Sequence, residues 1–531
     1  MKHLFLTIFL LFALAAAAQT AGRPDSTFGQ DGIVLLNYGP AEDHLSGMAL
    51  LPDNKIVLCA NVYADSSTGY IDLSGLMRLM PDGMLDNSFS GDGMYFSAFT
   101  PDSRLDAMAV QADGKIVAVG SRWIWETGET QVFLARFKTN GDQDLSFGTG
   151  GTMYTTLGSF LVGAAAVTVQ SDGKILVAGG LDYQFMVLRY LPNGMLDPAF
   201  GNQGVVTAAF SGGRLSASRI TLLPDGKIFM GGNWWNAGTP FAHTVFARLL
   251  PDGRFDSSFA ETGFRMYPIA WQHDNLANFS VLPNGQIVGA AECIDWVDYP
   301  WDYTTYIALF RLNADGTGDV SFGDLGLVKT VIPDPDIPIS QAGVSNLAIQ
   351  SDGKIVLAGS TFNSLLLLRY LSNGTLDSSG FGNNGMVFLP IAGYLGGAEQ
   401  LGLSAGGKIV AAGTTDLGNG DLGVVVVRLL NDLNVGVLDN PGSGIADYRC
   451  YPNPLTSAFT LQYTLPAGAE VQVRLFEPEG RLLATLLPAT RRPAGQNHET
   501  LRMPGNLPPG MYLLRLEAGS NRLVSIWVYK N

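Results

Sequence analysis

The fold is determined by the tetrapeptide Asp113-Gly114-Lys115-Ile116, which recurs along the chain. The same four residues begin again at Asp172, Asp225 and Asp352, and variants begin at Asp53 (DNKI), Asn284 (NGQI) and Gly406 (GGKI). The steps between successive starts are 60, 59, 53, 59, 68 and 54 residues, so the chain contains seven copies of one unit. Repetition at this period is typical of a propeller or a solenoid.

Each copy predicts four short β-strands. One strand follows a glycine, as in Gly204–Thr207, and a second runs into the Asp-Gly turn, as in Ala166–Gln170. A third leaves the turn (Lys174–Ala178), and a fourth contains an arginine (Phe185–Tyr190). Asp-Gly between apolar runs favours a type I′ hairpin turn, in which both central residues have positive φ. The chain is therefore expected to be all-β, with a seven-bladed β-propeller over residues 24–433. An open β-solenoid is the alternative.

Charged and aromatic residues recur at fixed places in the copies. The arginines are Arg78, Arg136, Arg189, Arg248, Arg311, Arg369 and Arg428; the aspartates are Asp25, Asp86, Asp144, Asp197, Asp256, Asp319 and Asp377; the phenylalanines are Phe28, Phe89, Phe147, Phe200, Phe259, Phe322 and Phe381. A guanidinium suits paired contacts with a carboxylate, so we expect structural Arg–Asp pairs such as Arg189–Asp197, and core positions for the phenylalanines. The counts match only if Asp25 pairs with Arg428. This predicts that the first strand, near Gly32–Leu36, completes the last blade and closes the ring.

The unit resembles the delta-60 repeat of exported bacterial proteins. The matching residues are the Asp-Gly-Lys-Ile turn, Arg189-Tyr190, and Leu196-Asp197 with Phe200-Gly201, and the match covers about Pro24 to Asp432. The resemblance implies the propeller fold. It brings no assigned catalytic activity.

The N-terminus predicts a secretory signal peptide over residues 1–18. Met1-Lys2-His3 precede an apolar run, Leu4–Ala18, which ends with Ala16-Ala17-Ala18 before Gln19. The run is too short to span a membrane comfortably. No later window approaches 18 apolar residues, so we expect no transmembrane segment in the mature chain.

The C-terminal part differs from the repeats. A stretch rich in Gly, Pro, Asn and Asp predicts a linker over residues 434–447. Short strand-like runs follow, including Phe459–Tyr463, Val471–Phe476 and Arg481–Leu486. Their alternating pattern predicts a small immunoglobulin-like β-sandwich over residues 448–531.

This segment resembles the type A C-terminal sorting domain of type IX secretion substrates. The matching features are Tyr451-Pro452-Asn453-Pro454, the Glu479-Gly480 turn before Arg481-Leu482, and Pro508-Pro509-Gly510-Met511-Tyr512. The resemblance implies that the type IX secretion machinery exports the chain through residues 448–531. The protein is then expected in the medium or on the outer-membrane surface of a Gram-negative bacterium.

Composition narrows the function classes. The 531 residues are 47% hydrophobic and 15% charged, which excludes disorder as the main state. The net charge of −15 argues against nucleic acid as a partner, because that binding depends on Lys and Arg contacts with phosphate. The three cysteines, Cys59, Cys293 and Cys450, are too few and too scattered for a disulfide framework or a zinc site. We expect no metal and no cofactor.

Two of the loops that connect the strands of each copy vary in length. In an up-and-down blade, both of these loops emerge on the same face. Aromatic side chains concentrate in or beside these connections: Trp123, Trp125, Trp234, Trp235, Trp271, Trp296, Tyr299, Trp301 and Tyr303. Exposed rings beside carboxylates and amides favour contact with a glycan or a protein. The alternative is that these rings pack the long loops onto the blades.

Three functions remain open. The first is a secreted or surface-displayed binding protein for a glycan or a protein. The second is an extracellular polysaccharide hydrolase or lyase that uses loop carboxylates, such as Glu292 with Asp295 or Asp298 with Asp302. The third is a structural surface protein. No catalytic residue is predicted, because Gly402–Gly406, which matches a nucleophile elbow, falls where the repeat places a hairpin.

Overall fold

The computed structural model describes residues 21–38, 43–66, 69–97, 99, 103–209, 213–236, 241–270, 273–298, 302–332, 342–361, 364–391, 397–417, 421–431, 446–451, 458–476, 482–505, 507, 510–519 and 522–530. Within these ranges every named element is a β-strand, which confirms the all-β prediction. In the same ranges, no helix could cross a membrane. The chain divides into two compact units, Met1–Asn431 and Asp432–Asn531.

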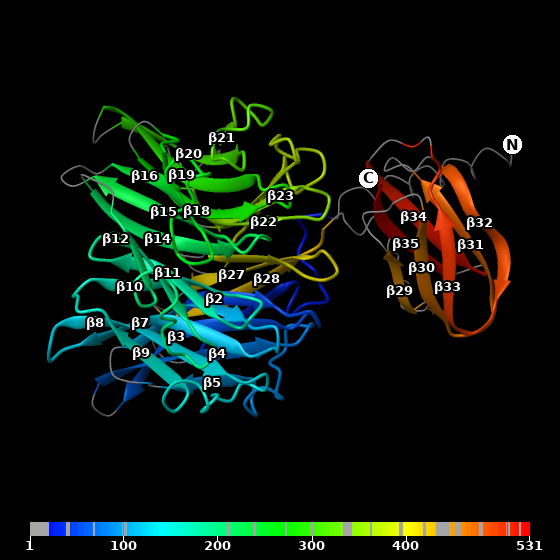
Figure 1. Cartoon of the computed structure of the whole chain (residues 1–531). Coiled ribbons are helices and arrows are strands. Elements are labelled where there is room, and N and C mark those ends of the chain that lie inside the picture. Colours follow the sequence, from blue (N-terminus) through cyan, green and yellow to red (C-terminus); the bar gives the residue numbers. More distant parts are fainter. Residues whose placement is uncertain are drawn as a thin grey trace, which may run out of the picture. The chain divides into compact units, whose positions relative to one another are not determined.

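In the described part of the first unit, the strands form seven four-stranded antiparallel sheets, or blades, in chain order (Figure 1). Blades 1 to 3 are β2(Asp43–Leu50) β3(Ile56–Ser66) β4(Gly69–Leu79) β5(Met94–Ser97); β6(Ser103–Val110) β7(Ile116–Ile124) β8(Glu129–Phe137) β9(Thr152–Thr156); and β10(Val162–Val169) β11(Ile175–Leu181) β12(Gln184–Tyr190) β13(Val205–Ala208). Blades 4 and 5, bridged by one parallel pair (Ala242 and His273), are β14(Gly213–Leu222) β15(Ile228–Asn236) β16(Ala242–Leu249) β17(Phe264–Tyr267); and β18(His273–Val281) β19(Ile287–Asp298) β20(Asp302–Leu312) β21(Leu327–Thr330). Blades 6 and 7 are β22(Gly343–Ile349) β23(Ile355–Ser360) β24(Leu365–Tyr370) β25(Met386–Leu389); and β26(Gln400–Leu403) β27(Ile409–Asp416) β28(Leu422–Leu429) β1(Ile33–Leu36).

The blades form a closed ring. The first strand of each blade contacts the first strands of the two neighbouring blades, and β26 of blade 7 contacts β2 of blade 1. The N-terminal strand β1 pairs with β28, from Ile33 opposite Val427 to Leu36 opposite Val424, which confirms the predicted closure. In Figure 1 the blue N-terminal segment lies beside the yellow strands β27 and β28. One strand of each sequence copy therefore belongs to the preceding blade, as β1 belongs to blade 7.

The turn that closes the ring is assembled from two chain ends. In blade 1 the corresponding turn is continuous: Gly83 N donates to Met80 O at 2.9 Å, and Met80 N donates to Met84 O at 2.7 Å. In blade 7, Gly22 N donates to Leu430 O at 2.9 Å, and Leu430 N donates to Arg23 O at 2.8 Å. Gly22 has a φ of 84° and Gly83 one of 91°, so the two glycines occupy equivalent left-handed positions.

The Asp-Gly turns are not of type I′. In the turn Gln111–Lys115, Gly114 has a φ of 81° whereas Asp113 is not left-handed. Gly114 N donates to Gln111 O at 2.9 Å, and Gln111 N donates to Lys115 O at 2.7 Å. This is a three-residue loop, in which a type I turn is followed by a left-handed glycine. The Asp113 carboxylate accepts a hydrogen bond from Lys115 N at 3.1 Å, which stabilises this form.

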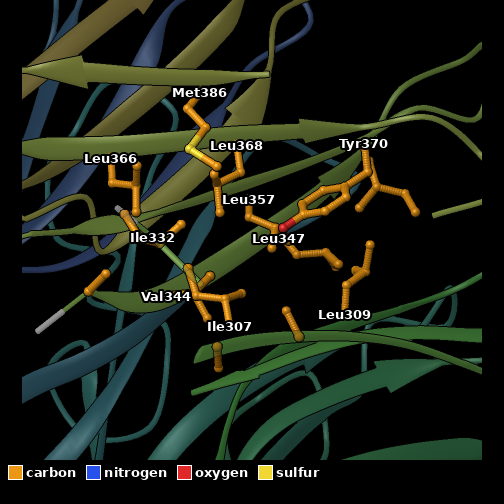
Figure 2. Packing of buried hydrophobic residues seen from close by; sticks show 14 of the residues in the cluster. Ile307, Leu309, Ile332, Val344, Leu347, Leu357, Leu366, Leu368, Tyr370 and Met386 are labelled. Atoms are coloured by element: carbon orange, nitrogen blue, oxygen red, sulfur yellow. The ribbon is translucent and has the colours of Figure 1, made fainter. Parts of the chain in front are cut away.

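The hydrophobic core lies mainly between neighbouring blades. Figure 2 shows the cluster shared by blades 5 and 6, where Ile307 and Leu309 of β20 pack with Leu357 of β23 and Leu366 of β24. All seven repeated phenylalanines are at most 1% exposed, as the core assignment predicts. Cys59 and Cys293 are also buried, each within a second strand.

The second unit contains two sheets. One sheet consists of β29(Ala446–Tyr451), β30(Ala458–Leu465) and β33(Gly495–Arg502); the other consists of β32(Leu482–Arg492), β31(Ala469–Phe476), β34(Gly510–Ala518) and β35(Arg522–Lys530). They share one core, with Leu461 from β30 and Val473 from β31 both fully buried. Strand β29 begins at Ala446, near the end of the stretch predicted to be a linker. The immunoglobulin-like assignment stays a prediction.

Candidate functional site

The repeated charges are used inside the scaffold. Each repeated arginine donates from Nε to its aspartate Oδ2 at 2.7 to 2.9 Å, in the pairs Arg78–Asp86, Arg136–Asp144, Arg189–Asp197, Arg248–Asp256, Arg311–Asp319, Arg369–Asp377 and Arg428–Asp25. The guanidinium also lies over the ring of a repeated phenylalanine. For example, Arg136 Cζ is 4.6 Å from the ring centroid of Phe147. Its Nη1 then binds a turn of the next blade, where Pro192 O accepts at 2.7 Å. We call this arrangement the Arg–Asp clamp.

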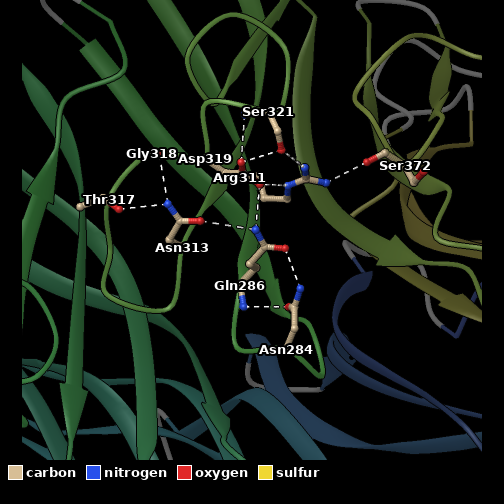
Figure 3. Close-up of polar contacts among 9 residues, drawn as sticks. All are labelled: Asn284, Gln286, Arg311, Asn313, Thr317, Gly318, Asp319, Ser321 and Ser372. Atoms are coloured by element: carbon tan, nitrogen blue, oxygen red, sulfur yellow. Dashed lines mark hydrogen bonds and ion pairs between the residues drawn. The ribbon is translucent and has the colours of Figure 1, made fainter. Parts of the chain in front are cut away.

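The clamp of blade 5 shows the same contacts with one substitution (Figure 3). Arg311 joins Asp319 of its own blade to Ser372 O of blade 6, at 2.7 and 3.0 Å. In other copies the lysine of the Asp-Gly-Lys-Ile tetrapeptide lies near the clamp aspartate. For example, Lys115 Nζ is 3.1 Å from Asp144 Oδ2. Here Gln286 takes that place and donates to Asp319 at 2.8 Å. The tetrapeptide therefore recurs for a structural reason as well as for its turn.

Asp25, in the clamp that joins the two chain ends, is held as an anion. Burial alone would raise the pKa of Asp25, but hydrogen bonds from Lys408 and Thr27 and the charge of Arg428 outweigh it and lower the pKa to about 2. The side chain of Asp25 is 3% exposed. The repeated charges thus neutralise one another within the scaffold.

Of the nine aromatic residues predicted to bind a ligand, the structure describes four side chains. Trp125 is 73% exposed, Trp235 38% and Trp123 36%. Trp234 is instead half-buried, and its ring is parallel to that of His243 with centroids 6.1 Å apart. Trp271, Tyr299 and Trp301 lie outside the described residues, and Trp296 and Tyr303 are described only as members of strands β19 and β20.

The exposed rings belong to a larger surface, which we call the aromatic arc: Trp123, Trp125, Phe160, Tyr183 and Trp235. Phe160 is 64% and Tyr183 44% exposed. Thr130 Oγ1 donates to Phe160 O at 3.0 Å, and Leu215 N donates to Tyr183 O at 2.7 Å. The arc therefore runs over the connections of blades 2, 3 and 4 on one face of the propeller.

A polar cavity lies near the axis on that face. It has a volume of about 560 Å³ and is lined by blades 7, 1 and 2. Its charged and polar side chains include His44, Arg104, Asp106, Glu399 and Gln400. We call it the axial cavity. Strand β7 links it to the aromatic arc, because Ser121 Oγ lies 3.5 Å from Asp106 Oδ2 and Trp123 follows two residues later.

A repeated β-bulge brings the carboxylates into the cavity. The register of the first strand shifts at one place in blades 1 to 6, for example between Leu45 and Gly47 opposite β3. In blade 7, Glu399 N donates to Ala412 O although Ala412 pairs with Gln400, so two residues again oppose one. An extra residue at this point is left outside the ladder, and the strand bends there. The bulge residues in chain order are Ser46, Asp106, Ala165, Ser218, Ala277, Ser345 and Glu399. Five of these side chains are small and uncharged, and the two carboxylates flank Ser46 in neighbouring blades.

Burial raises the pKa of Asp106, although Arg104 Nε lies 2.8 Å away and opposes the shift. Burial likewise raises the pKa of Glu399, against a hydrogen bond from Thr414 N at 3.2 Å and the charge of His44. The protonated form of a carboxyl group can donate a hydrogen bond as well as accept one. Together with Ser46, the two acids can exchange hydrogen bonds with a ligand rich in hydroxyl groups.

Sequence reasoning missed Asp106 and Glu399, although a signal was present. Each bulge residue stands ten positions before the first residue of the second strand, as Asp106 stands before Ile116 and Glu399 before Ile409. Aligning the copies at this position sets the two acids apart from Ser and Ala. The predicted carboxylate pairs lie elsewhere, on β19 and β20. Among the described residues, no group of three or more His, Cys, Asp or Glu side chains could hold a metal ion.

Comparison with known families confirms both resemblances. The description "Domain of unknown function (DUF5122) beta-propeller" matches residues 51–89, 111–147, 170–200, 223–259 and 350–379. The description "Secretion system C-terminal sorting domain" matches residues 449–530. Among curated proteins, none matches the sequence.

Several solved structures are similar. A Lactobacillus plantarum protein aligns over 84% of this chain and 99% of its own, with 13% identity and a TM-score of 0.41. The β-propeller domain of the Trilobed protease from Pyrococcus furiosus aligns over 76% and 100%, with 12% identity and a TM-score of 0.34. The α-L-arabinofuranosidase Arb93A from Fusarium graminearum aligns over 77% and 98%, with 10% identity and a TM-score of 0.36. These scores are too low to indicate a ligand or a reaction.

Proposed function

The chain is a secreted or surface β-propeller protein with DUF5122 repeats and a type IX sorting domain, and from this premise we propose that its propeller binds a glycan. The axial cavity carries the proposal. It gathers Asp106 and Glu399 at a position where the other blades have small residues, on the face that also holds the aromatic arc. The repeat itself does not require an acid at this position, since Ser or Ala occupies it in the other five blades.

The two surfaces suit different parts of a saccharide. Hydroxyl groups pair with the carboxyl, amide and hydroxyl groups of the cavity, and exposed rings such as Trp125 offer flat apolar area to the faces of sugar rings. The arc and the cavity are adjacent along β7, so an oligosaccharide can occupy both. A ligand of several sugar units fits this arrangement better than a monosaccharide.

One observation favours hydrolysis as the second candidate function. Asp106 and Glu399 lie in one cavity, and burial raises the pKa of both. Glycoside hydrolysis uses a pair of carboxyl groups, one of which is kept protonated as the general acid. The binding proposal needs no turnover, whereas this candidate requires it.

The test is a glycan array followed by a turnover assay, both on the full chain without its predicted leader. We expect saccharide binding that Asp106→Asn and Glu399→Gln each weaken about tenfold, as loss of a charged or buried hydrogen bond predicts. Trp125→Ala should weaken long oligosaccharides more than short ones. Glu261→Gln, an exposed change on the opposite face, should have no effect.

The results separate the candidates. Binding without products supports a binding protein, and products that disappear in Asp106→Asn or Glu399→Gln support a hydrolase. If no saccharide binds, or if both acid variants bind as well as the original chain, the axial cavity is not the site.

A further inference from the structure

A third unrepeated charge lies at the axis. The residue after the bulge is Gly47, Ala107, Ala166, Arg219, Asn278, Asn346 and Gln400 in blades 1 to 7, so Arg219 of blade 4 is the charged member of this set. Its Nη2 donates to Ser345 O of blade 6 at 3.2 Å. Because blade 5 stands between blades 4 and 6, the side chain must extend past the first strand of blade 5 to make this contact.

Arg219 differs from the clamp arginines in its partners. Each clamp arginine is 2.7 to 2.9 Å from an aspartate. Arg219 instead donates to two backbone carbonyls, Ser218 O at 2.9 Å and Ser345 O. In the part of the chain that the structure describes, no carboxylate forms an ion pair with it. Burial lowers its pKa, as expected when a cation is removed from water without a neutralising partner.

The neighbouring Ser218 adds a donor at the same place. Its hydroxyl oxygen is buried and has no hydrogen-bond partner among the described residues. A buried hydroxyl without a partner costs free energy unless something supplies one. Ser218, Ser345, Asp106 and Glu399 are all bulge residues, so Arg219 lies at the same height of the ring as the two acids, in contact with blade 6 and outside the lining of the axial cavity.

We propose that Arg219 and Ser218 bind an anionic group of the ligand, so that the glycan is an acidic one carrying carboxylate or sulfate groups. A guanidinium binds both groups through paired hydrogen bonds, and the two backbone carbonyls leave some of its N–H donors for that purpose. The raised pKa values of Asp106 and Glu399 reduce their repulsion of such a ligand. This inference rests on the proposed function, because it names the class of glycan that the propeller binds.

The experiment is isothermal titration of the full chain without its predicted leader. The probes are an oligouronate, the same oligosaccharide after reduction of its carboxyl groups, and a sulfated neutral oligosaccharide. We expect the oligouronate, the sulfated probe or both to bind at least about tenfold more tightly than the carboxyl-reduced probe. The first two probes distinguish carboxylate from sulfate.

Arg219→Met should abolish this preference and leave the affinity for the carboxyl-reduced probe unchanged, and Arg219→Lys should keep part of it. The matched control is Arg254→Met, which removes the same charge from a side chain that is 77% exposed in a turn. A purely structural Arg219 would change the unfolding temperature but not the ratio of affinities. Should Arg219→Met fail to fold, the preference of the original chain and of Arg219→Lys still tests the inference.

Two outcomes would overturn the inference. In the first, the original chain binds the carboxyl-reduced probe as tightly as both acidic probes; glycan binding then stands and the anion site fails. In the second, Arg219→Met folds and keeps the preference. If none of the probes binds and the glycan array is also blank, the proposed function fails as well.

Discussion

Asp25 and Arg428 are 403 residues apart in the sequence, yet Arg428 Nε donates to Asp25 Oδ2 at 2.7 Å. The contact has the geometry of the other clamps, and Arg428 also lies 4.6 Å from the ring centre of Phe28. The junction of the two chain ends is therefore stabilised by the same interactions as the junctions inside the ring.

Asp25→Ala should destabilise the propeller about as much as Asp197→Ala. Each change leaves a buried guanidinium without its carboxylate, which costs about 3 kcal/mol. Urea unfolding followed by tryptophan fluorescence measures both, and Glu126→Ala in an exposed connection should be neutral. An Asp25→Ala protein of unchanged stability beside a strongly destabilised Asp197→Ala would contradict the equivalence of the junctions.

The propeller should lose stability in acid between about pH 4 and pH 2. The pKa values of Asp25, Asp256 and Asp319 are held at about 2 in the folded state, below the ordinary value of 3.8. A lowered pKa contributes stability above the ordinary value, and this contribution disappears as the pH falls through the lowered one. Urea midpoints at pH 7, 4, 3 and 2 measure the effect. A flat profile across this range would contradict the assignment of the clamps as ion pairs.

Asp43 should make the propeller less stable as the pH rises, which is opposite to the effect of the clamp aspartates. This fully buried side chain accepts a hydrogen bond from Tyr38 N at 2.8 Å, and burial raises its pKa to about 6. Its contribution to stability is therefore full below the ordinary value of 3.8 and is lost as the pH rises through 6. Asp43→Asn should be more stable than the original chain at pH 8, by about 2 kcal/mol, and not at pH 4.

Thermal unfolding at the two pH values measures this difference, with the exposed change Asp53→Asn as the control. Two neighbouring charges also act on Asp43: His44 lowers its pKa, and Asp421 raises it. If Asp43→Asn lowers the stability equally at both pH values, the carboxylate is ionised throughout and the raised pKa is wrong.

Removal of residues 448–531 should stop delivery to the surface or the medium and leave the propeller folded. The two units have separate cores, and the sorting-domain match lies entirely within the second unit. Fractionation of cells that produce the truncated chain shows where it accumulates, and resistance to protease shows whether it is folded. Truncated protein in the medium at the original level would contradict the sorting role.

Repetition explains how much of the fold could be predicted. Seven arginines and seven aspartates leave Asp25 and Arg428 unmatched in a linear reading, and this imbalance predicts ring closure without any tertiary information. The predicted type I′ turn was wrong, because the Asp-Gly dipeptide fits both a two-residue and a three-residue hairpin loop. The hydrogen bond from Lys115 N to the Asp113 carboxylate accompanies the three-residue loop, and the dipeptide alone does not reveal it.

The candidate site was harder to predict because its residues come from blades that are far apart in the sequence. Asp106 and Glu399 meet only because the ring brings blade 7 beside blades 1 and 2, and because a bulge bends each first strand at one position. Tryptophans in loops often indicate a binding surface, yet the ring of Trp234 lies parallel to that of His243. Comparing the seven copies position by position would have found the acids, since these depart from Ser and Ala at one place.

The closing turn has a consequence for how this ring could be cut. In the closing turn, Asn431 and Ala21 occupy the places that Pro81 and Asp82 have in blade 1. Asn431 Oδ1 accepts a hydrogen bond from Arg369 Nη1 at 2.8 Å. In other clamps a backbone carbonyl accepts this hydrogen bond. A peptide bond from Asn431 directly to Ala21 would give a turn of the same length as the other six. New termini between Pro192 and Asn193 would then yield a circular permutant with the same seven clamps. The ring itself has no preferred beginning, and its present ends are where the predicted leader and the sorting domain are joined to it.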